Sequence, residues 1–340
     1  MKKLLAILLV MGIVVCFTAC SPKQGYQRTS LEVFDTVTVI SGYEKNKDVF
    51  EERADLIEKE LKRYHELFDI YSDHGKVNLK TVNDRAGEPV AVDGEIIEML
   101  LFGIDMYEKT EGKTNIAIGA VTALWHDARE EGRLPEESAL KQAAEHTDIE
   151  SIVIDRHAGT VLITDHLARI DVGAVAKGYA CDRVCEMIRD KGWSSYGLSI
   201  GGNVKTVGEK GDGTDWKIGV QDPDGTDAFF CTVEASDTSL VTSGSYQRYF
   251  EVDGVRYHHI IDPETLYPKD IYTSVTVMCD SSAIGDAFST ALFSMEYEDA
   301  LEMLRNHPDI QVIWRFADGR TEHTEGIGDR LTFKESSKLS

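Results

Sequence analysis

The stretch IDVGAVAKGYA, residues 170–180, decides how the middle of this chain folds. It predicts a β-strand that ends at Asp171, a turn of small residues, and a helix over 174–191 that stops before Gly192. Small residues in such a turn let a ligand approach the backbone, and the first N–H groups of the helix can bind an anion. The same pattern also fits a turn that only packs a strand tightly against a helix.

Helix and strand patterns alternate on both sides of this stretch. Apolar residues at helical spacing predict further helices over 47–68, 95–109, 136–146, 282–294 and 298–307. Alternating or β-rich runs predict strands over 34–40, 151–154, 161–164 and 310–316, with short strands and glycine turns over 197–277. We therefore expect an α+β fold with largely antiparallel sheets and packed helices.

The N-terminus has the pattern of a lipoprotein signal. Lys2 and Lys3 precede an apolar run of about 12 residues, which is too short to span a bilayer with ease. Small residues then precede Cys20, whose lipidation with two acyl anchors would hold the protein stably on a membrane. An ordinary cleaved signal with a chance cysteine is the alternative. We expect a signal peptide over 1–19, a polar tether over 20–30, one globular domain over 31–334 and a tail over 335–340.

Composition limits the possible partners. The net charge of −23 argues against nucleic acid or an anionic lipid surface. An anionic ligand would therefore need a local device, such as a metal ion, a helix N-terminus or a few cations. Cys181, Cys185, Cys231 and Cys279 are too few for a disulfide framework in a chain of 340 residues. We interpret Cys181 and Cys185, four apart on a predicted helix, as buried small residues rather than half a metal site.

Two glycine-containing motifs and a histidine pair follow the central stretch. In SIGGN, residues 199–203, paired glycines after a strand permit close backbone approach or a simple turn. The motif TSGSY, residues 242–246, is followed by YHHIIDP, residues 257–263. A neutral imidazole can accept a proton near pH 7, and His259 is our candidate general base. The alternative is that His258 and His259 only alternate between the two faces of a strand.

The helix predicted over 282–294 contains GDAFSTA, residues 285–291. Asp286 and Thr290 are four residues apart and so share one face of this helix. A carboxylate and a hydroxyl are hard oxygen ligands that suit Mg²⁺, although a local side-chain hydrogen bond would produce the same pattern.

These motifs together resemble one family, in their order and spacing. The chain is similar to the ApbE lipoproteins, which are FAD:protein FMN transferases, over residues 31–333. The resemblance implies an ApbE/T-fold-like α+β structure and Mg²⁺-dependent transfer of FMN from FAD to a threonine of a target protein, with release of AMP. The alternatives are a Mg²⁺-dependent FAD pyrophosphatase that gives FMN and AMP, and an FAD-binding lipoprotein without catalysis.

The resemblance also assigns site residues. It implies that Asp286, Thr290 and the backbone carbonyl of Ala174 hold Mg²⁺. The residues that match family positions in contact with FAD are Phe34, Tyr71, Lys113, Thr114, Asn115, Asp171, Lys177 and Ile260. This chain has Thr114-Asn115 where the family commonly has Phe-Asp, and an amide cannot replace a carboxylate as a base. Residues 71–76 are also less regular than the family's serine-rich stretch.

The implied setting follows from the same resemblance. We expect the acceptor of FMN to be a membrane-associated redox protein and expect no nucleic-acid partner. The enzyme would lie on the extracytoplasmic face of a bacterial membrane, anchored through Cys20.

Overall fold

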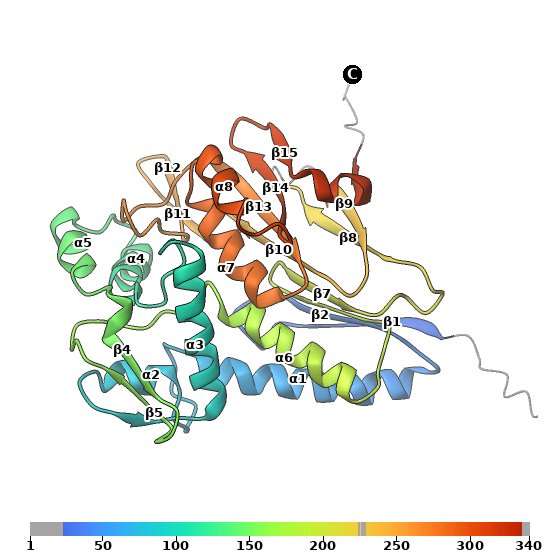
Figure 1. The fold of residues 1–340 in the computed structure, drawn as a ribbon, viewed down its shortest axis with the longest axis horizontal. Coiled ribbons are helices and arrows are strands. Elements are labelled where there is room, and N and C mark those ends of the chain that lie inside the picture. The colour runs from blue at the N-terminus through green and yellow to red at the C-terminus, as the bar shows by residue number, and fades with distance from the viewer. Residues whose placement is uncertain (1–22, 224, 226–228, 335–340) are drawn as a thin grey trace, which may run out of the picture.

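The computed structural model describes residues 23–223, 225 and 229–334, and its centre is an eight-stranded sheet (Figure 1). The strand order is β1-β2-β6-β7-β10-β13-β14-β15, and every neighbouring pair is antiparallel. The strands are β1 Gln24–Ser30, β2 Thr38–Glu44, β6 Tyr196–Ile200, β7 Asn203–Val207, β10 Ser239–Gly244, β13 Tyr272–Cys279, β14 Gln311–Phe316 and β15 Thr321–His323.

Helices cover one face of this sheet. α7 contacts β10 and β13, α6 contacts β7, and α1 contacts β2 and α6. Their bounds, with that of the helix following α7, are α1 Lys47–Phe68, α6 Ala176–Asp190, α7 Ser282–Phe293 and α8 Tyr297–Leu304. Val277 points into the core beneath these helices, and its strand partner Val241 packs against Gly285 of α7. Apolar residues of the two strands thus form part of the surface on which α7 lies.

A small sheet covers part of the opposite face. Its strands, in the order β16-β9-β8, are β8 Trp216–Gln221, β9 Phe229–Ala235 and β16 Leu331–Phe333, and the 3₁₀ helix η2 Glu325–Arg330 precedes β16. Leu240 and Met278 of the large sheet pack there with Ile218 and Val233. Because neighbouring residues of a strand point to opposite faces, β10 and β13 supply both cores.

The segment between α1 and α6 forms a lobe beside the sheet (Figure 1). It contains α2 Leu79–Asp84, β3 Val90–Ala91, α3 Gly94–Lys109, α4 Gly119–Glu131, α5 Glu137–Ala144, η1 Ile149–Ser151, β4 Ile152–Asp155 and β5 Thr160–Ile163. A hairpin of β11 Tyr249–Val252 and β12 Val255–His258 lies against α4. The ring centroids of Trp125 and Tyr257 are 5.9 Å apart in this contact. The contact joins the lobe to the part of the chain that carries the histidine pair.

The predicted fold class is confirmed, and most predicted elements lie within a few residues of their expected positions. The strand expected over 34–40 is an exception, because β2 begins only at Thr38. Phe34 and Asp35 have φ values of 55° and 50°, in the left-handed region that a β-strand does not use. Helices α2 and α4 were not predicted.

The tether expected over 20–30 is corrected in its second half. From Gln24 onward this segment is strand β1, which pairs with β2 over its whole length. Arg28 on β1 also donates to Glu51 and Glu58 of α1, each at 3.0 Å. The predicted signal peptide, Cys20 and the tail over 335–340 lie outside the described residues. Within the part of the chain that the structure describes, no helix is long and apolar enough to cross a membrane.

Candidate active site

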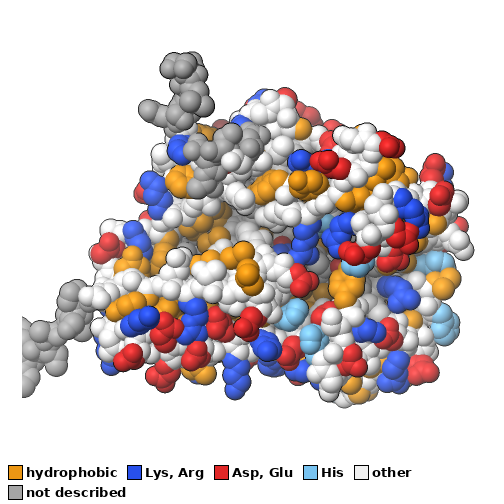
Figure 2. Space-filling view, turned by 180° about the vertical axis from the view of Figure 1, so that it is seen from behind, with side chains coloured by type: hydrophobic (Ala, Val, Ile, Leu, Met, Phe, Trp, Pro, Cys, Tyr) orange, Lys and Arg blue, Asp and Glu red, His pale blue; other side chains and the backbone are white. Residues whose placement is uncertain are grey.

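One cleft of about 940 Å³ brings the motifs together. Its walls come from the loop after α1, from α4, the turn before α6, the ends of β10 and β12, and α7. The predicted catalytic, FAD-contacting and metal-binding residues all line it: Phe34, Tyr71, Lys113, Thr114, Asn115, Asp171, Ala174, Lys177, His259, Ile260, Asp286 and Thr290. Seen from behind, the visible histidine side chains lie to the right of the molecule's centre, among both basic and acidic side chains (Figure 2).

Asp286 lies on the face of α7 that meets α6, and its side chain is almost fully buried. Lys177 Nζ is 3.3 Å from Oδ1, and the Gly178 N–H donates to Oδ2 at 2.9 Å. Burial nevertheless raises the pKa of the Asp286 carboxyl, because desolvation outweighs the attraction of Lys177 and the hydrogen bond from Gly178. The carboxylate is therefore incompletely compensated, which is the condition that a bound divalent cation would relieve.

Thr290 follows Asp286 by one turn and also faces the cleft. Its Oγ1 is 3.5 Å from Ser243 Oγ, which in turn is 2.9 Å from Ser289 Oγ. Ala174 lines the same cleft, in the turn that leads into α6. Carboxylate, hydroxyl and carbonyl oxygens are the donors that Mg²⁺ prefers, so this part of the cleft fits that ion.

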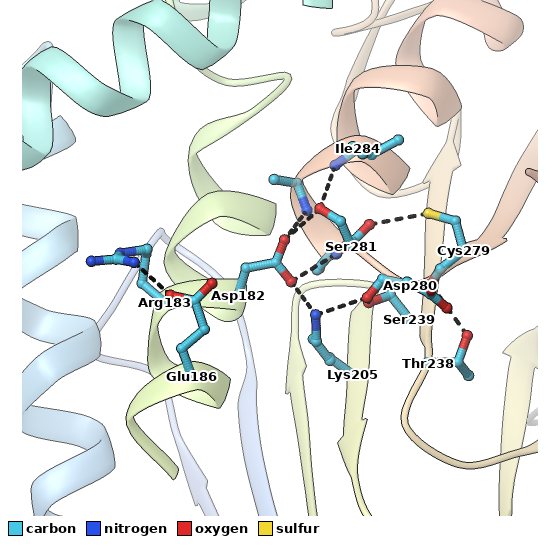
Figure 3. Close-up of polar contacts among 12 residues, drawn as sticks. Asp182, Arg183, Glu186, Lys205, Thr238, Ser239, Cys279, Asp280, Ser281 and Ile284 are labelled. Carbon is cyan, nitrogen blue, oxygen red and sulfur yellow. Dashed lines mark hydrogen bonds and ion pairs between the residues drawn. The ribbon is translucent and has the colours of Figure 1, made fainter. Parts of the chain in front are cut away.

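A carboxylate on α6 holds the start of α7 (Figure 3). Asp182 accepts hydrogen bonds from the Ser282 N–H at 2.8 Å, the Ala283 N–H at 3.0 Å and the Ser281 hydroxyl at 2.6 Å. Lys205 pairs with the same carboxylate. The negative charge of Asp182 caps free N–H groups at the positive end of the helix dipole, although it comes from another helix.

Close packing at Gly178 completes the α6–α7 contact. A Cβ atom at this position would lie 2.3 Å from the Ser282 carbonyl oxygen, so only glycine lets the helices approach this closely. The capping carboxylate and the Gly178 N–H together place Asp286 against the turn before α6. Here the predicted ligand-binding turn and the predicted metal face become one site.

The two histidines of the pair have different environments. His258 is buried, its Nε2 hydrogen-bonds the Lys269 carbonyl at 2.9 Å, and its Nδ1 accepts the Ile260 N–H at 3.2 Å. His259 faces the cleft, and its Nδ1 lies 3.2 Å from the Arg248 carbonyl oxygen. A carbonyl can only accept, so Nδ1 carries the proton and Nε2 has a free lone pair.

The charge state of His259 also suits a proton acceptor. The surrounding walls of the cleft lower the pKa of its imidazole by desolvation, and the positive charges of Arg248 and Lys177 lower it further. The ring is therefore neutral at physiological pH, although solvent in the cleft reaches it.

The turn before α6 is ordered by the residues that the sequence singled out. Asp171 Oδ1 accepts the Gly173 N–H at 2.8 Å, and Oδ2 accepts the Thr122 hydroxyl at 2.6 Å. Lys177 donates to the Gly173 carbonyl at 3.2 Å in addition to its contact with Asp286. Asp171 and Lys177 therefore shape the backbone next to which a ligand would lie.

In the loop after α3, the side chains of the predicted FAD-contacting residues are bonded to other parts of the protein. Lys113 Nζ is 2.9 Å from Glu264 and 3.1 Å from Asp262; burial disfavours its charge, but these acids outweigh that effect and raise its pKa. The Thr114 hydroxyl donates to the Ala287 carbonyl at 2.7 Å, and the Asn115 amide donates to a backbone carbonyl of Thr147 at 2.9 Å.

The mouth of the cleft contains Phe34 and Tyr71. The Tyr71 ring stacks on His126 at 5.0 Å, and the Phe34 N–H donates to His65 Nδ1 at 3.3 Å. Arg248 donates to the carbonyls of Phe34 and Asp35 at 3.1 and 3.2 Å. Arg248 thereby connects the loop before β2 to the backbone beside His259.

Several residues of α4 line the cleft but were not predicted, because the helix itself was not predicted. They are Thr122, Trp125, His126 and Arg129. The buried Val121, Trp125 and Ala128 recur at intervals of four and three, which is the signal that could have predicted this helix. Arg248 carries no such local signal.

A cleft with a buried carboxylate, hydroxyl groups, a cation and a neutral imidazole defines an enzyme with a large polar substrate. The chain belongs to the ApbE family, whose sequence pattern matches residues 33–314. It is 34% identical over 269 residues to the FAD:protein FMN transferase of Treponema pallidum, covering 74% of each chain. It is 31% identical over 257 residues to that of Klebsiella pneumoniae, covering 75% of this chain and 79% of the relative.

Solved structures agree with this assignment. The crystal structure of the ApbE protein from Thermotoga maritima superposes with a TM-score of 0.82 at 29% identity, covering 92% of this chain and all of that one. The flavin transferase ApbE from Vibrio cholerae superposes with a TM-score of 0.78 at 24% identity, covering 91% of this chain and all of that one, and shows the shared fold.

Proposed function

We propose that this enzyme transfers FMN from FAD to a threonine hydroxyl of another protein and releases AMP. The observation that carries the proposal is that one cleft gathers Asp286, Thr290 and the free Nε2 of His259. The relatives named FAD:protein FMN transferase support the choice of substrate.

Asp286, Thr290 and the Ala174 carbonyl would hold Mg²⁺ in this proposal. When bound, the ion would neutralise diphosphate charge and polarise the phosphorus under attack. The protein's own contribution is to keep the Asp286 carboxylate in place through the Gly178 N–H, with Lys177 as a second positive charge beside the diphosphate.

His259 would act as the general base. The threonine oxygen forms a bond to the phosphorus of the FMN half, the bond from that phosphorus to the oxygen of AMP breaks, and the hydroxyl proton moves to His259 Nε2. A positioned base of this kind accelerates reactions by roughly 10²–10⁴-fold. The hydrogen bond between Nδ1 and the Arg248 carbonyl keeps the ring in the required tautomer.

We also infer that Cys20 carries the lipid anchor and places the enzyme on the extracytoplasmic face of a bacterial membrane. The acceptor would be a membrane-associated redox protein. Confining both partners to one surface would raise their effective concentration.

The test is incubation of the protein with FAD, Mg²⁺ and a threonine-bearing candidate acceptor, followed by mass spectrometry and AMP detection. Covalent FMN on the acceptor with equimolar AMP supports the proposal. Free FMN with AMP and no labelled acceptor would show a pyrophosphatase, and FAD retained without AMP would show a binding protein. Asp286→Asn should abolish transfer, whereas the exposed Glu186→Gln on α6 serves as the matched control.

A further inference from the structure

Three metal-ligating side chains meet at the wall of the cleft, outside the groups used in the proposed reaction. His65 lies in the last turn of α1, Asp69 caps its C-terminus, and His74 returns from the following loop. One ligand atom from each lies within 4.8 Å of the other two. No other histidine, cysteine or acidic residues in the described ranges form such a group of three.

The loop is built to bring His74 back to the helix. Asp69 Oδ1 accepts the N–H groups of Tyr71 and Ser72 at 2.7 and 3.0 Å, which leaves Oδ2 to meet His74 Nε2 at 2.7 Å. The Asn78 amide donates to the Ser72 carbonyl at 2.9 Å and closes the loop. These bonds orient the carboxylate in the way that outer groups orient metal ligands.

We propose that His65, Asp69 and His74 form a binding site for a divalent transition-metal ion of the Zn²⁺ type. Two imidazole nitrogens and one carboxylate oxygen suit Zn²⁺ rather than Mg²⁺, which prefers oxygen alone. Three protein ligands leave a coordination position open, and all three residues line the cleft. This site is separate from the oxygen donors Asp286 and Thr290.

Metal binding has a structural cost that makes the site testable. His65 Nδ1 accepts the Phe34 N–H at 3.3 Å, so Nε2 carries the proton in the neutral ring. An ion on Nδ1 replaces this hydrogen bond directly. An ion on Nε2 requires the proton to move to Nδ1, which then faces the Phe34 N–H and breaks the bond. Either way, binding releases the Phe34 amide.

The experiment is calorimetric titration of the protein with Zn²⁺ as the only added ligand, in a buffer that contains a saturating concentration of Mg²⁺. We expect one Zn²⁺ per chain, and a loss of affinity in His74→Gln at least as large as the roughly 10- to 100-fold typical of removing a group that orients a ligand. His157→Gln, in the exposed turn between β4 and β5, is the matched control and should bind as the wild type does.

A second measurement follows hydrogen exchange at the Phe34 amide, which should become faster with Zn²⁺ in the wild type and not in His74→Gln. Equal Zn²⁺ affinity in the wild type and His74→Gln would overturn the proposal and leave the cluster as a hydrogen-bonded clasp of the loop. Tight binding without any change at Phe34 would exclude His65 as a ligand and overturn the three-residue site.

Discussion

His258 and His259 are neighbours in the chain and differ in nearly every property that matters for chemistry. Both ring nitrogens of His258 are used inside the protein, by the Lys269 carbonyl and the Ile260 N–H. Only one nitrogen of His259 is used, and the ring faces the cleft. His258, the last residue of β12, is therefore a structural histidine, whereas His259, the next residue, is available for proton transfer.

Replacing His259 by alanine should lower flavin transfer by roughly 10²–10⁴-fold while the protein stays folded. In the wild type, the lowered pKa of His259 keeps its imidazole neutral even when the pH is below about 6.5, the usual pKa of histidine. The value of kcat/KM should therefore stay level as the pH falls through about 6.5. Rates measured against pH at limiting FAD check this. Unchanged transfer in His259→Ala would remove this residue from the reaction.

As a contrast, His258→Ala should cost about 1–3 kcal/mol of unfolding free energy by leaving its two hydrogen-bond partners unpaired.

Asp286→Asn should abolish activity and, in the absence of Mg²⁺, change the stability of the protein by an amount that depends on pH. A carboxyl whose pKa is raised on folding stabilises the protein below its unfolded pKa, and this contribution is lost as pH rises through the folded pKa. Asparagine does not titrate, so the melting temperature of Asp286→Asn relative to wild type should rise as the pH increases above about 4, the pKa of an unperturbed aspartate, in the absence of Mg²⁺. Thermal unfolding across this range measures the difference, and a fall with pH would contradict the assignment. Mg²⁺ should then stabilise the wild type and not the variant.

At the scale of elements, the site depends on how α7 docks onto α6. The Asp182 carboxylate caps the first turn of α7 and pairs with Lys205, which is itself nearly buried. Burial opposes the charge of Lys205, but Asp182 outweighs this effect and raises the pKa of that ammonium group. The start of α7 is thus held several residues before Asp286, on the same helix.

Asp182→Ala should destabilise the protein by about 3–5 kcal/mol, because it leaves Lys205 as an uncompensated buried charge. Asp182→Asn also leaves Lys205 without its counter-charge, but its amide oxygen can still accept a hydrogen bond from an N–H group at the start of α7. It should therefore cost less stability than Asp182→Ala, and we expect a weaker Mg²⁺ response of transfer with kcat at saturating Mg²⁺ largely retained. Denaturant unfolding and Mg²⁺ titration of the rate separate the two effects. Glu186→Gln, an exposed ion pair on the same helix, should change stability by less than about 1 kcal/mol. Equal effects in both positions would show that the α6–α7 cap has no special role.

At the scale of the whole molecule, the N-terminal segment belongs to the sheet. β1 covers the outer edge of β2, and Arg28 ties it to α1. Residues Gln24–Ser30, which the predicted tether contained, therefore belong to the folded domain.

A form that starts at Ser21 should transfer flavin in solution, because it keeps β1 and loses only the predicted anchor. A form that starts at Leu31 should melt at a lower temperature and aggregate more readily, since the edge of β2 becomes exposed. Thermal unfolding and transfer assays on both forms decide this. Equal stability of the two forms would show that β1 adds nothing to the domain, and inactivity of the Ser21 form would show that the anchor does more than confine the enzyme.

The sequence by itself determined the helices with clear apolar spacing, the fold class and the motifs that meet in the cleft, because side-chain periodicity and turn residues act over a few neighbouring positions. It did not reveal the strand β1 or the left-handed backbone at Phe34, where local patterns are weak, and α4 was missed although its apolar residues have helical spacing. Only the tertiary structure decided which histidine faces the cleft, how Asp182 caps a helix that starts 100 residues later, and that His65, Asp69 and His74 meet. Such contacts join surfaces brought together by packing, and no local pattern specifies which surfaces will meet.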